Sequence, residues 1–117
     1  MSIYAEQTSP LMRDQNGDPI PDGYRNMQSG NKSVTTAGTP VALAAVSTEV
    51  KRLDVTANYT NTDMVTIGGS GVVGAASGRK GVPIAPGNTY TFFVADLAQV
   101  YIDSVVNGEG ISYNYFW

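Results

Sequence analysis

Three glycines in the middle of the chain have the spacing of a nucleotide-binding loop. Gly69, Gly71 and Gly74 form the pattern G-x-G-x-x-G. In a dinucleotide-binding fold this pattern follows a strand and opens a helix, whose free N–H groups bind the pyrophosphate. Residues 63–67 favour a strand, but residues 75–83 contain two more glycines and a proline, which exclude a helix. The pattern therefore predicts a long connection between two strands, with no nucleotide cofactor.

Carboxylates are the second group of residues that could do chemistry. Asp14, Asp18 and Asp22 recur at intervals of four residues, which invites comparison with a calcium-binding loop. The last position of such a loop requires a glutamate, but Arg25 stands there. Turn formation by the aspartate side chains is the preferred interpretation, and no metal site is expected.

Asp96, Asp103 and Glu109 lie near expected turns in the C-terminal half of the chain. Two such carboxylates could hydrolyse a glycosidic bond if they lay about 5 Å apart, but solvated turn carboxylates are the preferred interpretation. The chain contains no histidine and no cysteine, so its serines have no imidazole base and it has no thiolate nucleophile. We therefore expect a protein that is not an enzyme and binds neither a cofactor nor a small-molecule substrate.

The amino-acid composition disfavours two classes of binding partner, nucleic acids and membranes. The 117 residues suffice for one domain, and a net charge of −3 with only 15% charged residues disfavours binding to nucleic-acid phosphates. No run approaches the roughly 18 apolar residues of a membrane span. The first residues also lack the basic and apolar parts of a signal peptide. We expect neither a nucleic acid nor a membrane as partner.

The chain divides near residue 33 into an N-terminal arm, residues 1–32, and a β-domain, residues 33–117. The arm is rich in turn-forming groups such as Asn16-Gly17 and Ser29-Gly30-Asn31. Its few apolar side chains cannot offset the entropy of ordering it, so it needs a surface on which to lie. Its own domain, a neighbouring copy and another protein all remain open as that surface. The expected contact residues of the arm are Ile3, Tyr4, Leu11, Met12, Ile20, Tyr24 and Met27.

The β-domain consists of short runs of strand-forming residues separated by turn signals, roughly every 8–12 residues. Within one run, Leu53, Val55 and Ala57 alternate with polar residues, as on a half-buried strand. We predict an all-β fold, either an antiparallel β-sandwich or a jelly-roll-like small barrel, with an extended N-terminal arm. The expected strands are residues 33–37, 41–46, 49–57, 63–67, 81–85, 89–94, 99–106 and 111–117.

The segment 111–117 is the most aromatic part of the chain. On a strand, Tyr113, Tyr115 and Trp117 share one face and Phe116 lies on the other. Aromatic side chains suit a core strand, but aromatics on both faces would let one face pack on the core while the other meets a partner. Both interpretations remain open. The expected interface residues of the domain are Arg79, Lys80, Tyr115, Phe116 and Trp117.

Several short motifs of the β-domain occur together in a known family. They are Val65-Thr66-Ile67-Gly68-Gly69, Gly81-Val82-Pro83-Ile84-Ala85-Pro86-Gly87, Asp96-Leu97, Val100-Tyr101-Ile102-Asp103 and Gly108-Glu109-Gly110-Ile111-Ser112-Tyr113, preceded by residues 39–57. With these motifs, residues 33–117 resemble a recurrent small β-domain in structural proteins of tailed bacteriophages. The motifs describe strands and turns and include no catalytic signature. The arm has no counterpart in this resemblance.

The resemblance implies a virion component without enzymatic activity, and a capsid decoration (cement) protein fits its size, acidity and arm best. Such a protein would bind the major capsid protein on the outer surface of the capsid, after synthesis in the cytoplasm of the bacterial host. Its arm would bridge neighbouring subunits, so it would bind the assembled lattice better than free subunits and stabilise it. The family also implies contacts between copies of the chain, often as a trimer.

Two alternatives remain. A tail, fibre or head–tail connector-associated module keeps the protein in the virion. A carbohydrate-binding β-sandwich belongs to a different class, in which Tyr59, Tyr101 or Trp117 would stack on a sugar ring.

Overall fold

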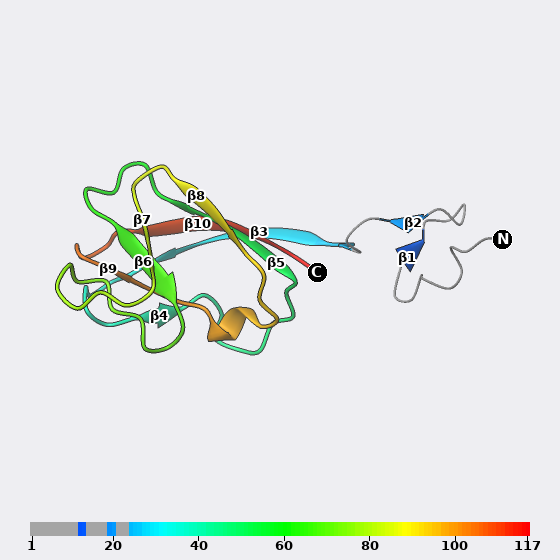
Figure 1. Cartoon of the computed structure of the whole chain (residues 1–117), viewed down its shortest axis with the longest axis horizontal. Helices are drawn as coiled ribbons and strands as arrows, with labels where there is room; N and C mark the ends of the chain where they lie inside the picture. The colour runs from blue at the N-terminus through cyan, green and yellow to red at the C-terminus, as the bar shows by residue number, and fades with distance from the viewer. Residues whose placement is uncertain (1–11, 14–18, 21–23) are drawn as a thin grey trace.

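The computed structural model describes residues 12–13, 19–20 and 24–117. Eight strands form two four-stranded antiparallel sheets that face each other as a sandwich (Figure 1). They are β3 (Met27–Ser33), β4 (Val41–Ala42), β5 (Arg52–Ala57), β6 (Val65–Gly68), β7 (Val82–Ile84), β8 (Thr89–Phe92), β9 (Tyr101–Ser104) and β10 (Gly110–Phe116). The structure further contains the paired strands β1 (Met12–Arg13) and β2 (Pro19–Ile20) and a 3₁₀ helix, η1 (Leu97–Gln99). No helix among the described residues is long and apolar enough to cross a membrane.

The order of the strands identifies the sandwich as a jelly roll. One sheet has the order β3-β10-β5-β8 and the other the order β4-β9-β6-β7. The first of the eight strands therefore pairs with the last, the second with the seventh, the third with the sixth and the fourth with the fifth. This is the pattern of one long hairpin rolled up on itself. The predicted all-β sandwich is confirmed.

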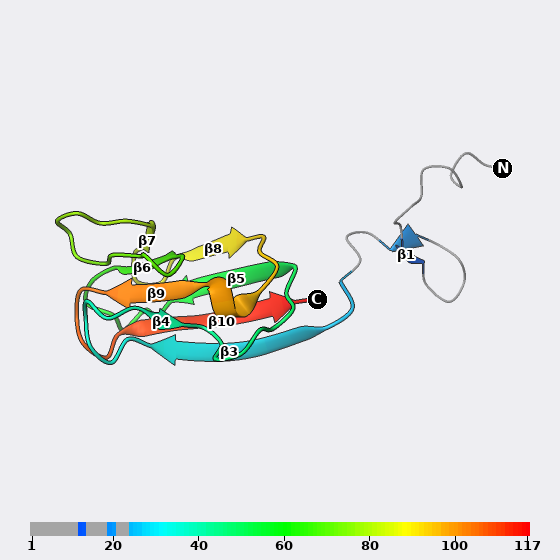
Figure 2. The ribbon, with the colours of Figure 1, turned by 90° about the horizontal axis from the view of Figure 1, so that it is seen from below.

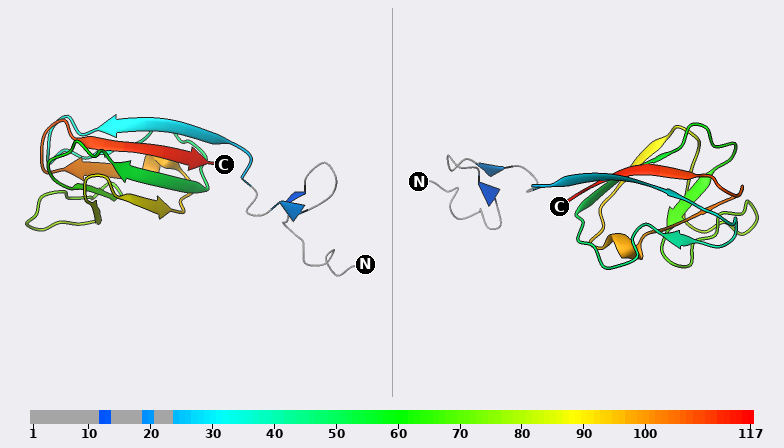
Figure 3. Two further views of the ribbon diagram at one scale, coloured as in Figure 1. Left: turned by 90° about the horizontal axis from the view of Figure 1, so that it is seen from above. Right: turned by 180° about the vertical axis from the view of Figure 1, so that it is seen from behind.

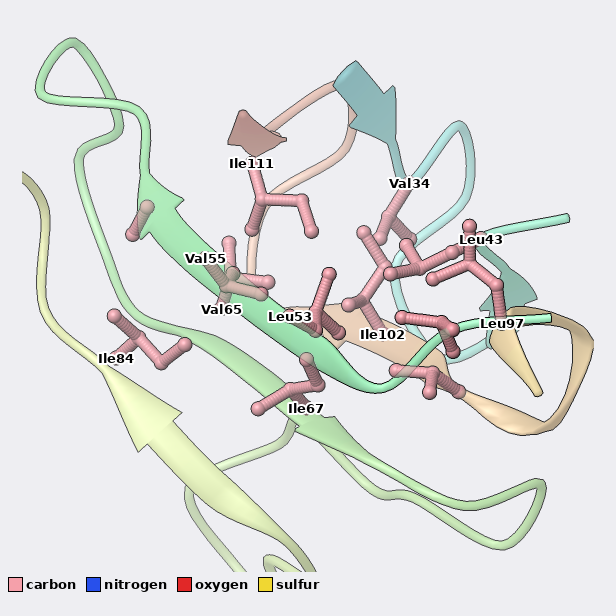
Figure 4. Packing of buried hydrophobic residues seen from close by; sticks show 13 residues of the cluster. Val34, Leu43, Leu53, Val55, Val65, Ile67, Ile84, Leu97, Ile102 and Ile111 are labelled. Atoms are coloured by element: carbon pink, nitrogen blue, oxygen red, sulfur yellow. The ribbon is translucent and has the colours of Figure 1, made fainter. Parts of the chain in front are cut away.

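The core lies between the two sheets, and β5 shows how the sequence builds it. Leu53, Val55 and Ala57 are fully buried on its inner face, while the polar residues between them lie on the outer face. Val65 and Ile67 of β6 face them from the opposite sheet (Figure 4). The other buried members of the cluster are Val34, Leu43, Val50, Ile84, Leu97, Val100, Ile102 and Ile111. Burial of such branched side chains, worth about 1.5–3 kcal/mol each, is the main force that joins the sheets.

The sandwich begins earlier in the chain than the sequence predicts. Ser29, Gly30 and Asn31, which predict a turn, lie in the middle of β3, and β3 pairs with β10 over its whole length. Gly30 suits this place because a Cβ there would lie 2.7 Å from the phenol ring of Tyr113. Packing across the strands overrides the local turn propensity, so residues 27–32, which the sequence assigns to the arm, are part of the sheet.

Two predicted strands are absent or shorter in the structure. Residues 33–37 do not form a strand, because the chain turns after β3 and the Val34 N–H donates to the carbonyl of Glu109. Of the predicted strand at residues 41–46, only β4 pairs in a sheet. The apolar Leu43 and Val50 beyond it are buried from an irregular loop. The apolar residues of this loop therefore fill the end of the core, although they do not form a strand.

Candidate partner-binding surface

Asp96, one of the carboxylates considered for catalysis, holds two loops together. It accepts hydrogen bonds from the N–H groups of Thr48 and Ala98 and from the Ser47 hydroxyl, each at 2.9 Å. The Thr48 N–H, followed by the Ala98 N–H and the Ser47 hydroxyl, lowers the pKa of Asp96 against the opposing effect of desolvation. The ionised carboxylate of Asp96 therefore links the loop before β5 to η1 through hydrogen bonds.

Glu109 has a comparable role at the opposite end of the sandwich. Its carboxylate accepts the N–H of Thr62 at 2.6 Å, the hydroxyl of the same residue at 2.8 Å and the N–H of Asp63 at 3.2 Å. Desolvation raises the pKa of Glu109, but these hydrogen bonds outweigh it and leave the pKa below its ordinary value. Glu109 fastens the loop between β5 and β6.

Asp103 explains the glycine-rich segment. Its side chain lies on the outer face of β9, 1% exposed, where Oδ2 accepts the Gly74 N–H at 2.8 Å and Oδ1 accepts the Gly38 N–H at 2.9 Å. A Cβ on Gly74 would lie 2.9 Å from the backbone carbonyl carbon of Asp103. Close packing of residues 69–81 against the sheet therefore requires the glycine. The segment joins β6 to β7, so the predicted connection between two strands is confirmed.

Among the described residues, no group of three or more His, Cys, Asp or Glu side chains could hold a metal ion. Asp14, Asp18 and Asp22, the calcium-like series, lie outside the described residues. The most distinctive remaining feature is a surface of aromatic and apolar side chains.

This surface lies at the end of the sandwich where β3 begins and β10 ends (Figure 2). Arg25 and Asn26 both donate N–H bonds of 2.8 Å to the carbonyl of Trp117, whose N–H donates to the carbonyl of Asn26 at 3.1 Å. The N-terminal arm therefore joins the domain beside the last residues of β10. We call this end the terminal surface and define it as Tyr24, Met27, Val46, Phe93, Tyr115, Phe116 and Trp117.

Phe116 is the centre of the outer side of the terminal surface. The ring of Tyr24 lies 5.8 Å from its ring centroid, and the guanidinium carbon of Arg52 lies 5.3 Å from it. Arg52 also forms an ion pair of 3.1 Å with Asp54. Met27 lies opposite Phe116 on β3 and is 62% exposed. Aromatic, methionine and arginine side chains are the types enriched at protein interfaces.

The inner face of β10 carries a ladder of aromatic rings. The ring centroids of Tyr113 and Tyr115 are 6.2 Å apart, and those of Tyr115 and Trp117 are 5.3 Å apart with planes tilted by 25°. Burial, together with the neighbouring Tyr115, raises the pKa of Tyr113, whose hydroxyl donates to the carbonyl of Leu43 at 3.3 Å. Tyr113 and Tyr115 pack against the core. The ladder fixes the position of the strand that presents Phe116 on its other face.

Val46 and Phe93 belong to the terminal surface but are not among the residues predicted from the sequence. They are 71% and 72% exposed, on the loops before β5 and after β8. These loops are joined by Asp96 and by a 2.9 Å bond from the Leu97 N–H to the Thr48 carbonyl. The one available signal is that Phe93 directly follows Phe92, so an alternating strand must turn one of the two rings outward.

An apolar hollow of about 340 Å³ opens between the edge strands β7 and β8. Its lining comprises Ile67, Gly68, Gly69, Gly81, Val82, Phe92, Val94, Gln99 and Val100. The three glycines have no side chains to fill the space, and Phe92 and Val94 flank the exposed Phe93 in the chain. The hollow adds a concave apolar area next to the terminal surface.

The remaining predicted contact residues lie elsewhere. Arg79 donates to the carbonyl of Gly74 from Nε at 3.3 Å and from Nη2 at 3.2 Å, and Lys80 pairs with Val73. Both basic residues therefore belong to the loop over β6 and β9 and not to the terminal surface. Met12 and Ile20 are paired in β1 and β2, whereas Ile3, Tyr4 and Leu11 lie outside the described residues.

The aromatic residues considered for sugar binding lie apart from one another. Tyr59, 84% exposed, follows the end of β5 that pairs with Ile111, whereas Trp117 follows the opposite end of β10, about 20 Å along the strand. Tyr101 is the first residue of β9 in the other sheet. No family model, curated protein or solved structure matches this chain.

Proposed function

We propose that this chain is a non-enzymatic structural protein of a tailed-bacteriophage virion, a capsid decoration protein that stabilises the assembled lattice. The observation that carries the proposal is that the arm joins the sandwich at the terminal surface, beside Phe116 and Trp117. The arm and the aromatic end of β10 can therefore act on the same partner. The jelly-roll topology, which recurs in viral capsid proteins, and the resemblance of the sequence motifs support the same function.

In the proposed complex, the terminal surface rests on the major capsid protein. Exposed Phe93 and Met27 supply apolar area, and the stacked rings behind Phe116 hold the surface rigid, which reduces the entropy lost on binding. The arm extends to a neighbouring capsid subunit. Contacts with two subunits at once favour the assembled lattice over free subunits, since the second contact forms at high effective concentration.

Counting the copies of the chain in purified virions by quantitative mass spectrometry, relative to the major capsid protein, tests the proposal. A number comparable to that of the capsid protein supports decoration of the lattice. A few copies per particle would instead favour the tail, fibre or connector module, and absence from virions would remove the virion setting altogether.

A pair of variants tests whether the terminal surface makes the contact. Phe93→Ser should weaken binding to capsids that lack the protein by about tenfold or more, because an exposed ring in an interface contributes on the order of 1–2 kcal/mol or more. Tyr59→Ser is the matched control, since Tyr59 is also highly exposed but lies at the opposite end of the sandwich. Equal losses for both variants, or no loss for Phe93→Ser, would contradict this role.

The arm is tested by removing residues 1–23, which leaves all eight strands of the two sheets intact. We expect a folded protein that occupies capsids more weakly than the full chain. Unchanged occupancy would show that the arm does not bridge subunits.

A further inference from the structure

The two sheets have four edge strands, and one of them differs from the others. β4 has two residues, β7 contains Pro83 among its three residues, and β8 has four residues. Short edge strands and edge prolines are devices that prevent unwanted strand pairing. β3 has seven residues without proline, and most of them are exposed. Figure 3 (left) shows β3 as the outermost strand of its sheet, beside β10.

The hydrogen-bond pattern of β3 shows which of its backbone groups point away from the sheet. Asn26 and Trp117 exchange both backbone bonds, so their pair is of the hydrogen-bonded type. Such pairs alternate along an antiparallel ladder with pairs whose N–H and C=O groups point outward. The outward groups of β3 are therefore those of Met27, Ser29, Asn31 and Ser33. Among the described residues, no strand pairs with this edge.

We propose that β3 pairs antiparallel with β3 of a second copy of this chain, about a two-fold axis at Gly30. Gly30 is the middle residue of the strand, so this register overlaps all seven residues and lets all the outward N–H and C=O groups bond across the axis. Ser29 then lies opposite Asn31 of the second copy, and Met27 opposite Ser33 of the second copy. The two four-stranded sheets become one continuous sheet of eight strands.

The side chains of β3 favour a second copy as the occupant of this edge. The only charged residue of the strand is Lys32, and in the full-overlap register it faces the neutral Gln28 of the second copy. No like charges meet, and the two glycines on the axis place no side chain between the strands. Each arm would join its domain beside Ser33 of the other copy. This inference concerns the free protein and does not depend on the proposed function in the virion.

The register predicts opposite effects for two substitutions of Gln28. Gln28→Lys places like charges opposite each other twice, once on each side of the axis, whereas Gln28→Glu creates two opposite-charge pairs with Lys32. Cross-strand pairs of this kind change affinity measurably, so we expect the dimer dissociation constant to rise about fivefold with Lys and to fall about fivefold with Glu. Sedimentation equilibrium of the full chain at low salt, without capsids, measures both constants.

A second pair of variants tests the backbone contact itself. Asn31→Pro removes one outward N–H and places a ring in the path of the second strand, but it leaves the bonds to β10 intact. Asn31→Ala keeps the N–H and is the control. We expect dimerisation to be lost with proline and retained with alanine, with both variants folded by circular dichroism. Either of two results would overturn the proposal. The chain could be a monomer at all concentrations or a trimer, or it could be a dimer whose dissociation constant does not change with the Gln28 and Asn31 variants.

Discussion

The outer faces of the two sheets differ in their exposure to solvent. The sheet β3-β10-β5-β8 exposes short polar side chains, such as Thr89 and Ser112, around a shallow hollow of about 520 Å³. The sheet β4-β9-β6-β7 is covered on its outer side, where Thr66 and Asp103 are 0% and 1% exposed beneath the glycine-rich segment. The outer face of the first sheet is open to solvent, whereas the outer face of the second is covered by the loop of residues 69–81.

The difference follows from strand length. The strands of the covered sheet have two to four residues, whereas β3 and β10 have seven each. Short strands make few ladder bonds, so additional contacts must hold that sheet together. Asp103 supplies them by accepting backbone N–H groups from two loops. The contacts on the covered side therefore stabilise the fold. The long strands of the open side provide the β3 edge and the terminal surface, which are available to partners.

The largest expected effect comes from comparing two aspartates that point outward from the central strands of the two sheets. Asp103→Ala should lower the free energy of unfolding by about 3 kcal/mol, because it leaves buried N–H groups without acceptors. Asp54→Ala on the open sheet should cost less than about 1 kcal/mol, since its partners are the part-exposed Arg52 and the exposed Thr91 hydroxyl. Urea unfolding followed by the fluorescence of Trp117, the single tryptophan, measures both. Similar costs would show that the two faces do not differ.

A smaller effect is expected from the packing of the covering loop. Gly74→Ala should destabilise the protein by about 1–3 kcal/mol, because the new Cβ would press on the backbone of β9 at Asp103. Gly71→Ala is the control within the same loop: a Cβ there meets nothing within 4 Å, and the change should stay within about 0.5 kcal/mol. Equal behaviour of the two variants in urea would mean that the loop does not rest on the sheet.

The smallest effect has the opposite sign. The hydroxyl of Thr66 is buried and has no hydrogen-bond partner among the described residues. Thr66→Val keeps the shape and removes this group, so the midpoint of thermal unfolding should rise, by the equivalent of about 1 kcal/mol. Thr56→Val on the open sheet breaks a 2.6 Å contact with Thr89 and should lower the midpoint slightly. If both substitutions destabilise the protein, the Thr66 hydroxyl is not buried without a partner as described.

The parts of the fold that could be predicted from the sequence are those set by local pattern. The alternation of Leu53, Val55 and Ala57 identifies β5 and its inner face, because one face of that strand is buried and the other is not. β3 could not be found this way. Its Ser29-Gly30-Asn31 has turn propensity, and the ring of Tyr113 that makes the glycine suitable comes from a strand far away in the chain.

The candidate surface could be predicted only in part, for a similar reason. Phe116 lies on the face opposite Tyr115 and Trp117, as the period of a strand requires. The exposure of Val46 depends on how its loop is held by Asp96, and the internal use of Arg79 depends on the carbonyl of Gly74. The first is a contact between segments 48 positions apart, and the second depends on how residues 74–79 fold back on themselves, so neither is recorded in a local hydrophobic pattern.

The rolled-hairpin topology also has a consequence for the order in which the molecule can form. β10 lies between β3 and β5, and Ser29 bonds to Asn114, 85 positions later in the chain. During synthesis β3 therefore lacks β10, its neighbour among the described strands, until residue 116 has left the ribosome. Such distant closure makes folding slow. The seven residues of β3 remain open on both edges for that time, so they stay exposed to mispairing until β10 is available.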